Sequence, residues 1–365
     1  MTDRPIDRET RFSVSSFQSP VPSPFNVADS YTPAWWVPGA HLQTLWGKLV
    51  RRPPVVPTRA ERWTTPDDDE LEIRRLDAAR DADERTPRLL VLHGLEGTIR
   101  SHYLRGILDQ ARLRGWAADV LIFRGCNGEV NRAPRLYHSG ETTDFDFVIR
   151  RLIAEHPDQP LVAAGFSLGG NVLLKWLGEQ GDSVPEQLRA AAAVSVPYDL
   201  ERGSRHIERG FSRLYTRHFL RTLRGKALAK LARHPGLFDA ELLRQASTLF
   251  EFDDVVTAPV HGFEGASDYY SRSSSRHFLG GIKRPVLLLS ALDDPFLPRE
   301  VANDVAMLAN SNEHLSVEFH ERGGHVGFVS GHLPWRPHYY AEERAMQFLE
   351  EQLAISSFSS RTQRP

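Results

Sequence analysis

Residues 160–179 read PLVAAGFSLGGNVLLKWLGE and contain the pattern G-x-S-x-G at residues 165–169. The apolar run before the pattern is typical of a buried strand, and residues 170–179 have the apolar spacing of a helix. A serine at a sharp turn from strand to helix needs small residues two positions to either side, because larger side chains would clash there. The start of the helix also directs backbone N–H groups toward a developing negative charge. The pattern therefore predicts that Ser167 is a nucleophile, the alternative being a chance turn with a capping serine.

The chain on both sides of this stretch alternates between apolar runs and helical patterns. Predicted strands cover residues 70–76, 88–93, 118–123, 160–165, 190–196, 285–291 and 315–320, and predicted helices cover residues 142–153, 170–179, 300–309 and 340–353. This alternation indicates a mostly parallel, twisted sheet with helices on both faces. Active sites in such sheets lie at the C-terminal ends of the strands.

One long segment interrupts the alternation. Nearly ninety residues, largely helical in character, separate the predicted strands 190–196 and 285–291. A structureless loop of that length is uncommon in a compact domain, so we predict an inserted helical cap over about residues 200–280. The predicted domain is then 34–352, with its core at 60–199 and 281–352 and tails at 1–33 and 353–365. In the segment before the core, Trp35, Trp36 and Trp46 are expected to form a buried cluster.

A nucleophilic serine needs a base and an acid that orients the base. In α/β-hydrolases these follow in the chain order Ser, acid, His. Asp293 and Asp294 come directly after the predicted strand 285–291. Asp294 is favoured because an acid four residues before a proline, here Pro298, is the usual arrangement in the acid loop. Asp293 is the alternative, and its other role would be to cap the following helix. His325, in a glycine-rich loop after the last strand, is the predicted base.

A second turn suggests where the oxyanion would bind. His93-Gly94 follows the predicted strand 88–93. An H-G turn at this place commonly supplies one backbone donor, so the predicted oxyanion hole consists of the N–H groups of Leu95 and Leu168. The alternative is an ordinary turn between a strand and a loop.

Several stretches together resemble the YheT-like family of α/β-hydrolases, which is related to the eukaryotic ABHD esterases and lipases. They are WWVPGAHLQTL, LLVLHGLEG, FRGCNGE, NRAPRLYHSGETTDFD, GFSLGGN and the run from Asp253 to Asp294. The resemblance covers about residues 33–352 and implies a Ser-Asp-His hydrolase of carboxylic esters, of the short-chain carboxylesterase or acylglycerol lipase type. It carries over onto Ser167, Asp294 and His325. Eukaryotic relatives often carry an N-terminal membrane anchor that this sequence lacks, so a bacterial-type soluble enzyme is the expected comparison.

The same residues leave other functions open. An acyltransferase, a thioesterase or an amidase would use the same three side chains, and a non-catalytic ligand-binding protein could keep the fold. The expected partner is a small-molecule ester or lipid.

The composition of the chain argues against several other classes of protein. The 365 residues carry a formal net charge of −2, which argues against a whole-protein basic field for nucleic-acid binding. The single cysteine, Cys126, cannot form an intrachain disulfide. It does not lie in a sharp turn from strand to helix like the one predicted for Ser167, so it is expected to be structural. With no apolar run near ~18 residues and no signal peptide, the expected location is the cytoplasm.

No cofactor and no metal are expected. The sequence has no phosphate-binding loop and no dinucleotide fingerprint. Asp293-Asp294 has no matching His or Glu cluster at ligand spacing. The remaining histidines, such as His102, His138, His261 and His320, are expected to be structural.

The predicted cap contains an arginine stripe. Arg205, Arg209, Arg213, Arg217 and Arg221 are spaced by four and would share one face of a helix, with Ile207, Phe211, Leu214 and His218 on another face. The favoured interpretation is that the arginine face is solvated and the other face is buried. The alternative is peripheral contact of this basic helix with an anionic membrane surface.

Overall fold

The computed structural model describes residues 31–362 of the chain and the side chains of residues 31–356. Of the tail predicted for residues 1–33, all but the last three residues lie outside this range. The strands are β1 (Arg59–Thr64), β2 (Glu70–Leu76), β3 (Arg88–Leu92), β4 (Ala117–Ile122), β5 (Leu161–Phe166), β6 (Leu188–Val194), β7 (Val286–Ala291), β8 (Leu315–His320), β9 (Val329–Ser330) and β10 (His338–Tyr339). The helices are α1 (Ala40–Leu49), α2 (His102–Leu113), α3 (Thr143–Glu155), α4 (Leu168–Gln180), α5 (Leu200–Ile207), α6 (Arg213–Arg233), α7 (Ala240–Gln245), α8 (Leu249–Phe252), α9 (Ala258–His261), α10 (Ala266–Ser273), α11 (Arg299–Ala309) and α12 (Tyr340–Thr362).

Eight strands form one twisted sheet in the order β1-β2-β4-β3-β5-β6-β7-β8. The pairs from β4 to β8 are parallel, whereas β1 and β2 join the sheet antiparallel. The strands β4, β5 and β7 are buried along their whole length, and this explains their continuous apolar sequences. The polar strand β1 was not predicted, because its sequence RAERWT gives no clear apolar alternation.

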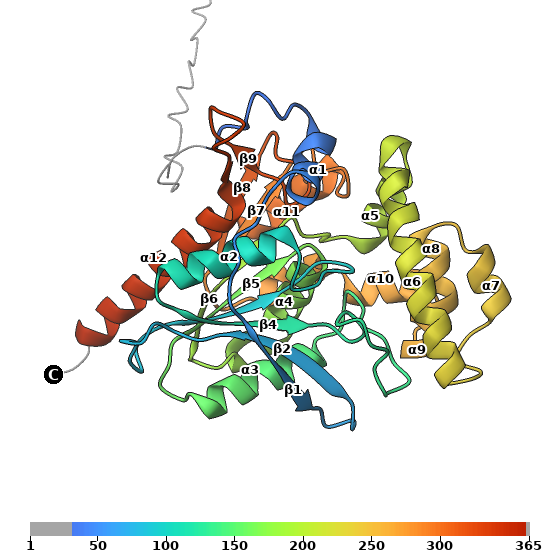
Figure 1. Ribbon diagram of the computed structural model, residues 1–365, viewed down its shortest axis with the longest axis horizontal. Coiled ribbons are helices and arrows are strands. Elements are labelled where there is room, and N and C mark those ends of the chain that lie inside the picture. The colour runs from blue at the N-terminus through green and yellow to red at the C-terminus, as the bar shows by residue number, and fades with distance from the viewer. Residues whose placement is uncertain (1–30, 363–365) are drawn as a thin grey trace, which may run out of the picture. The chain divides into compact units, whose positions relative to one another are not determined.

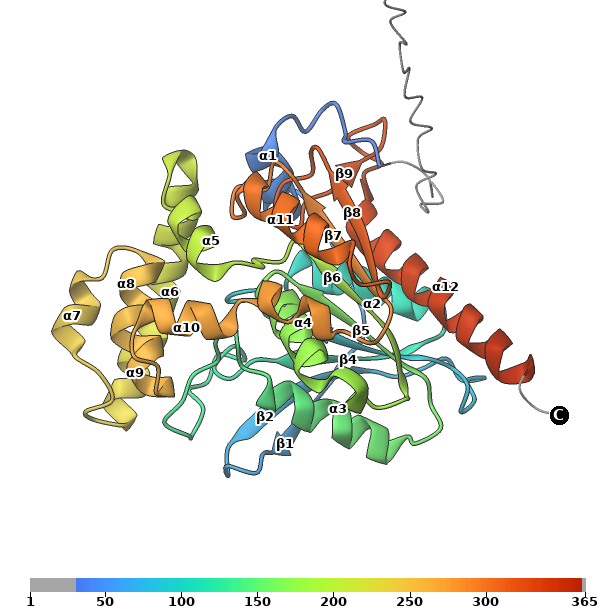
Figure 2. The same cartoon turned by 180° about the vertical axis from the view of Figure 1, so that it is seen from behind.

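Helices cover both faces of the sheet. α2 and α12 pack together on one face, and α3, α4 and α11 lie on the other (Figures 1 and 2). The parallel strands from β3 to β7 therefore end on a common edge, where the loops after β3, β5 and β7 meet. This arrangement confirms the predicted fold class, a mostly parallel sheet between two layers of helices with an inserted helical segment.

The helices α5 to α9 leave the sheet and form the cap beside it before α10 returns to the core (Figure 1). The cap has an apolar centre of its own, formed by Leu220, Ala227, Leu243, Phe252 and Val256. Within the described residues, no helix is both long and apolar enough to cross a membrane.

The arginine stripe does not lie on one helix. α5 ends at Ile207 and α6 begins at Arg213, because Gly210 adopts a left-handed φ of 53° between them. All five arginines are exposed, but so are Phe211 and Leu214, each 49% accessible. The prediction of a buried apolar face on a single helix was therefore wrong.

Two other expectations also differ from the structure. Trp36 and Trp46 pack edge to face at 4.8 Å, but Trp35 is 75% exposed, so the cluster contains only two of the three tryptophans. The final helix α12 reaches Thr362 and includes most of the residues predicted as a C-terminal tail. Residues 354–362 contain no glycine or proline to end the helix earlier.

Glycines at the start of α4 allow the chain to turn sharply. A Cβ atom on Gly165 would lie 2.6 Å from the carbonyl oxygen of Gly169 and 2.6 Å from the Cα of Gly170. By contrast, a Cβ on Gly225, in the middle of α6, would meet nothing within 4 Å. These two positions offer a matched pair of substitutions.

We expect Gly165→Ala to lower the free energy of unfolding by about 3 kcal/mol or more, because backbone atoms would have to move. Gly225→Ala should raise it by about 0.5–1 kcal/mol, since alanine favours the helix. Urea unfolding followed by circular dichroism measures both. Equal stability of Gly165→Ala and the wild type would contradict the close packing described for this turn.

Candidate active site

Ser167 occupies the turn between β5 and α4. Its backbone has φ 52° and ψ −122°, a strained conformation for a residue other than glycine. The turn is held by hydrogen bonds from Ser167 N to Val194 O (2.8 Å) and from Gly170 N to Ser167 O (2.9 Å). The side chain thus stands at the C-terminal edge of the sheet, at the start of a buried helix.

His325 and Asp294 lie in line with this serine. His325 Nε2 is 2.9 Å from Ser167 Oγ, and His325 Nδ1 is 2.8 Å from Asp294 Oδ2. A carboxylate can only accept, so Nδ1 carries the hydrogen and Nε2 is left to accept the serine hydroxyl. Asp294 is only 2% exposed, which keeps this contact away from water.

The neighbouring Asp293 faces elsewhere. Its Oδ1 accepts the N–H groups of Gly323 and Gly324, each at 2.9 Å, and so holds the loop that carries His325. Burial raises the pKa of the Asp293 carboxyl, and these two backbone donors oppose that rise. Asp293 does not cap α11, whose N-terminal cap is Pro298. The two acids therefore have different contacts, and only Asp294 meets the imidazole.

Three residues that support His325 were not found from the sequence. Thr44 Oγ1, on α1, accepts the N–H of His325 at 2.9 Å. Ser195 Oγ accepts the N–H of Val326 at 3.0 Å, and the ring of Phe296 stacks on the imidazole at 4.1 Å. The helix α1 was not predicted, although the stretch WWVPGAHLQTL contains its first turns. The apolar spacing of Leu42, Leu45 and Leu49 was the available signal.

The predicted oxyanion donors belong to two segments next to the serine. Leu168 is the first residue of α4, and Leu95 follows Gly94 in the loop after β3. A Cβ on Gly94 would lie 3.1 Å from Ser167 Cβ, so this loop passes close to the serine. Within the described part of the chain, neither the Leu95 N–H nor the Leu168 N–H donates a hydrogen bond. Two unused donors beside a serine suit a developing oxyanion.

Cys126 is buried and has no disulfide partner. Burial raises the pKa of its thiol to about 11, so the sulfur stays protonated at neutral pH. A protonated thiol is a poor nucleophile.

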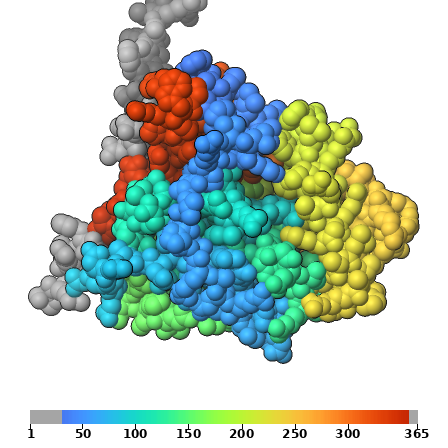
Figure 3. Space-filling view, viewed as in Figure 1, coloured from blue at the N-terminus to red at the C-terminus, as the bar shows by residue number. Residues whose placement is uncertain are grey.

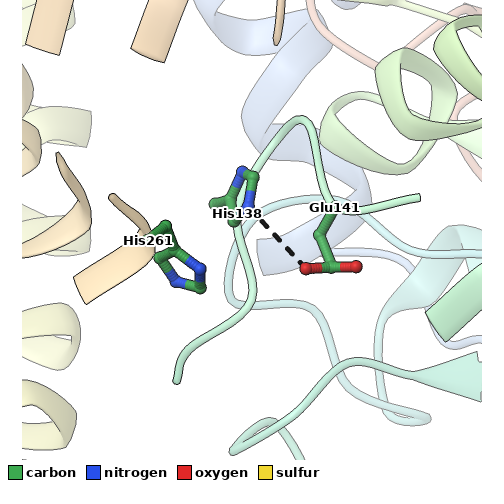
Figure 4. Close-up of side chains that lie close together, drawn as sticks. All are labelled: His138, Glu141 and His261. Carbon is green, nitrogen blue, oxygen red and sulfur yellow. Dashed lines mark ion pairs between the residues drawn. The ribbon is translucent and has the colours of Figure 1, made fainter. Parts of the chain in front are cut away.

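A second cluster of polar side chains lies between the core and the cap. His138, Glu141 and His261 each place one potential ligand atom within 4.8 Å of the others, and Figure 4 shows the three side chains together. His138 and Glu141 come from the loop before α3, whereas His261 is the last residue of α9 in the cap. The two imidazole rings are 4.4 Å apart.

The hydrogen bonds of this cluster do not suit a metal ion. His138 Nδ1 accepts the N–H of Gly140, and His261 Nε2 accepts the N–H of Leu136. A neutral histidine has one acceptor nitrogen, so the other nitrogen of each ring carries hydrogen and cannot bind a metal. Arg135 also pairs with Glu141 and would repel a cation. Burial lowers the pKa of His138 to about 3 and that of His261 to about 4, so both rings are neutral at pH 7.

Comparison with known proteins identifies the family of this chain. A family model described as the alpha/beta hydrolase fold matches residues 87–331. The chain belongs to this family. The α/β hydrolase is 38% identical to "Putative esterase YheT" of Escherichia coli (strain K12), over 91% of this chain and 96% of that protein. It is 30% identical to phospholipase ABHD3 of Mus musculus, over 89% of this chain and 79% of that protein.

A solved structure supports the fold of this α/β hydrolase. An esterase from Pyrococcus furiosus aligns with a TM-score of 0.53 at 16% identity, over 82% of this chain and 91% of that chain. Together with the relatives' names, the family supports ester hydrolysis. The resemblance to YheT-like α/β-hydrolases seen in the sequence is confirmed.

The different contacts of the two acids give a direct test. We expect Asp294→Asn to lower kcat for a p-nitrophenyl ester by about 10³- to 10⁴-fold, because an amide cannot hold the imidazole in the required tautomer. Asp293→Asn keeps an oxygen acceptor for the Gly323 and Gly324 N–H groups. Its kcat should therefore fall by no more than about tenfold. Steady-state kinetics of both variants measures this, and the reverse order would identify Asp293 as the acid.

Proposed function

We propose that this chain is a serine hydrolase of carboxylic esters that works through an acyl-enzyme. The observation that carries the proposal is the hydrogen-bonded series Ser167–His325–Asp294 at 2.9 and 2.8 Å. The strained turn that exposes the serine and the two unused N–H groups beside it are independent support.

The mechanism follows from these contacts. His325 Nε2 removes the hydroxyl proton as Ser167 Oγ attacks the ester carbonyl, and Asp294 stabilises the imidazolium that forms. The N–H groups of Leu95 and Leu168 bind the oxyanion of the tetrahedral intermediate. His325 then gives its proton to the alcohol as the bond between the carbonyl carbon and the alcohol oxygen breaks. The acyl group remains bonded to Ser167 Oγ. Water, deprotonated by the same histidine, releases the acid and restores the enzyme.

The surroundings of His325 favour an apolar substrate. The ring of Phe296 covers the imidazole, and the cap side chains Tyr215 and Phe219 pack against Phe296 at 5.0 and 6.0 Å. This aromatic wall suits the acyl chain of a short-chain ester or an acylglycerol. Transfer to another alcohol, or cleavage of a thioester or amide, would use the same groups, and product analysis with competing acceptors separates these reactions.

We expect Ser167→Ala to lower turnover of a p-nitrophenyl ester by about 10⁴-fold or more, because the nucleophile is lost. A fluorophosphonate probe should label the folded wild-type protein and not the variant. Activity within a few-fold of the wild type in the variant would remove Ser167 from this role. A wild-type protein that is folded, unlabelled and inactive would favour the non-catalytic, ligand-binding alternative.

We also propose that the face formed by α1 and the start of α6 contacts an anionic membrane surface. The helices touch through His41 and Tyr215 (3.2 Å) and through Lys48 and His218 (2.9 Å), and they lie beside each other in Figure 3, where α1 is blue and the start of the cap is yellow-green. Large apolar side chains are exposed in these two helices and directly beside them, namely Leu42, Leu49, Val50, Phe211 and Leu214.

The charge of this face fits anionic lipid. α6 contains seven lysines and arginines and no aspartate or glutamate. Arg213, Arg217 and Arg221 are exposed and make no ion pair with another described residue. Exposed apolar groups among unpaired cations are typical of a surface that lies on a bilayer. Because α1 and α6 also support His325 through Thr44 and Tyr215, such contact would bring lipid close to the site.

Vesicle co-sedimentation tests the membrane contact. The wild type should bind vesicles of phosphatidylglycerol more strongly than vesicles of phosphatidylcholine. The triple variant Arg213→Gln, Arg217→Gln, Arg221→Gln should bind the anionic vesicles about 100-fold more weakly, since each cation near the surface contributes about 1 kcal/mol.

Three arginines at the opposite end of the sheet provide the control. All three are exposed: Arg80 and Arg85 precede β3, and Arg189 is the second residue of β6. Changing all three to glutamine alters the net charge equally but should leave binding unchanged. If both triple variants lose affinity to the same degree, the attraction is not specific to the α1–α6 face.

A further inference from the structure

The loop after β3, residues 93–97, is held by side chains that the mechanism does not use. Glu96, next to Leu95, has a left-handed φ of 56°. Its N–H donates to the hydroxyl of Tyr137 (2.9 Å), and this hydroxyl donates in turn to Glu96 Oε1 (2.8 Å). Tyr137 is itself fixed by stacking on Phe123 at 5.5 Å with an angle of 2° between the rings.

The cap supplies the third member of this network. Lys226 Nζ, on α6, donates to Glu96 Oε1 at 2.7 Å and lies 3.4 Å from the sulfur of Cys126. The side chains of Lys226 and Glu96 are 30% and 10% exposed. Burial lowers the pKa of the Lys226 ammonium, but its interactions, the hydrogen-bonded Glu96 carboxylate among them, shift the pKa above its ordinary value, so the ammonium is charged at neutral pH. Removing one partner of such a pair leaves the other charge buried and unpaired.

The network acts on the backbone that carries the Leu95 donor. A residue other than glycine in the left-handed region costs about 1–3 kcal/mol and persists only when its surroundings hold it there. The Glu96 carboxylate and N–H, fixed by Lys226 and Tyr137, hold the peptide that follows Leu95. An oxyanion donor is effective only when it is aimed at the oxyanion before the reaction begins.

We infer that Lys226 is a positioning residue for the oxyanion hole: acting through Glu96, it fixes the direction of the Leu95 N–H. The inference rests on the proposed function, because it assumes that Leu95 binds the oxyanion. It assigns the cap a part in catalysis that is separate from substrate binding. One cap helix, α6, then contacts both the oxyanion loop through Lys226 and the side of His325 through Tyr215 and Phe296.

The test compares two lysines on the same helix. Lys226→Met removes the cation from Glu96, and we expect kcat to fall by about 10- to 100-fold with KM changed less than threefold. Loss of a complete oxyanion donor costs about 10²- to 10³-fold, so a displaced donor should cost less. Lys230 is a matched control, since it is buried on α6 and binds the carbonyl groups of Asn131 and Ala133. Lys230→Met should lower Tm while kcat stays within threefold.

A transition-state analogue provides a readout that a purely structural role would not change. A trifluoromethyl ketone forms a tetrahedral adduct with the serine and places an oxyanion in the hole. Its inhibition constant should rise in Lys226→Met by the same factor as kcat falls, and Lys226→Arg should restore both. If Lys226→Met does not fold, Glu96→Gln serves instead, because it removes the charge and keeps an oxygen for Tyr137.

The outcomes are distinct. A folded Lys226→Met enzyme with kcat and inhibitor affinity within threefold of the wild type would overturn the inference. So would equal losses of kcat in Lys226→Met and Lys230→Met. A wild-type protein that hydrolyses no ester would instead overturn the proposed function, whatever the variants do.

Discussion

The structure of the site depends on one constraint, the turn that takes the chain from β5 into α4 at Ser167. The turn is strained at the serine and leaves no room for a side chain at Gly165. Because it sits at the C-terminal edge of a parallel sheet, the loops after the neighbouring strands reach the same place. The loop after β3 brings Leu95, and the loops after β7 and β8 bring Asp294 and His325.

Parts of the chain outside the sheet complete the arrangement. α1 precedes the first strand, yet its Thr44 accepts the backbone N–H of His325. The cap follows β6, yet its Lys226 reaches the loop after β3 and its Tyr215 packs on Phe296. Ser167, Asp294 and His325 thus come from loops at the edge of the sheet, whereas their orientation depends on the segments that cover them. Substitutions in the cap should therefore affect turnover as well as substrate choice.

The sequence predicted the parts of the molecule whose residues are strongly patterned. Buried parallel strands such as β5 and β7 are continuous apolar runs. The pattern G-x-S-x-G at the end of such a strand left few alternatives to a sharp turn at the serine. The order of the acid and histidine loops follows from the strands that precede them. The polar strand β1 lacks such a pattern, and the helix α1 has only the spacing of Leu42, Leu45 and Leu49, so both were missed.

Prediction from the sequence was wrong or incomplete where contacts between distant parts of the chain decide the structure. Arginines spaced by four suggested one helix, but Gly210 breaks it, and the apolar face expected to be buried is exposed at Phe211 and Leu214. The pairing of Lys226 with Glu96 joins residues 130 positions apart and leaves no local pattern. Asp293 and Asp294 are adjacent, so only the structure separates the residue that meets the imidazole from the one that holds the glycine loop.

The central claim is that Ser167 carries the acyl group during turnover. Mixing the enzyme with a p-nitrophenyl ester, quenching with acid and mapping the peptides by mass spectrometry tests this directly. One acyl group on the peptide that contains Ser167, absent when the ester is omitted, is the predicted result. Turnover of the ester with the acyl group on a different residue would contradict the claim.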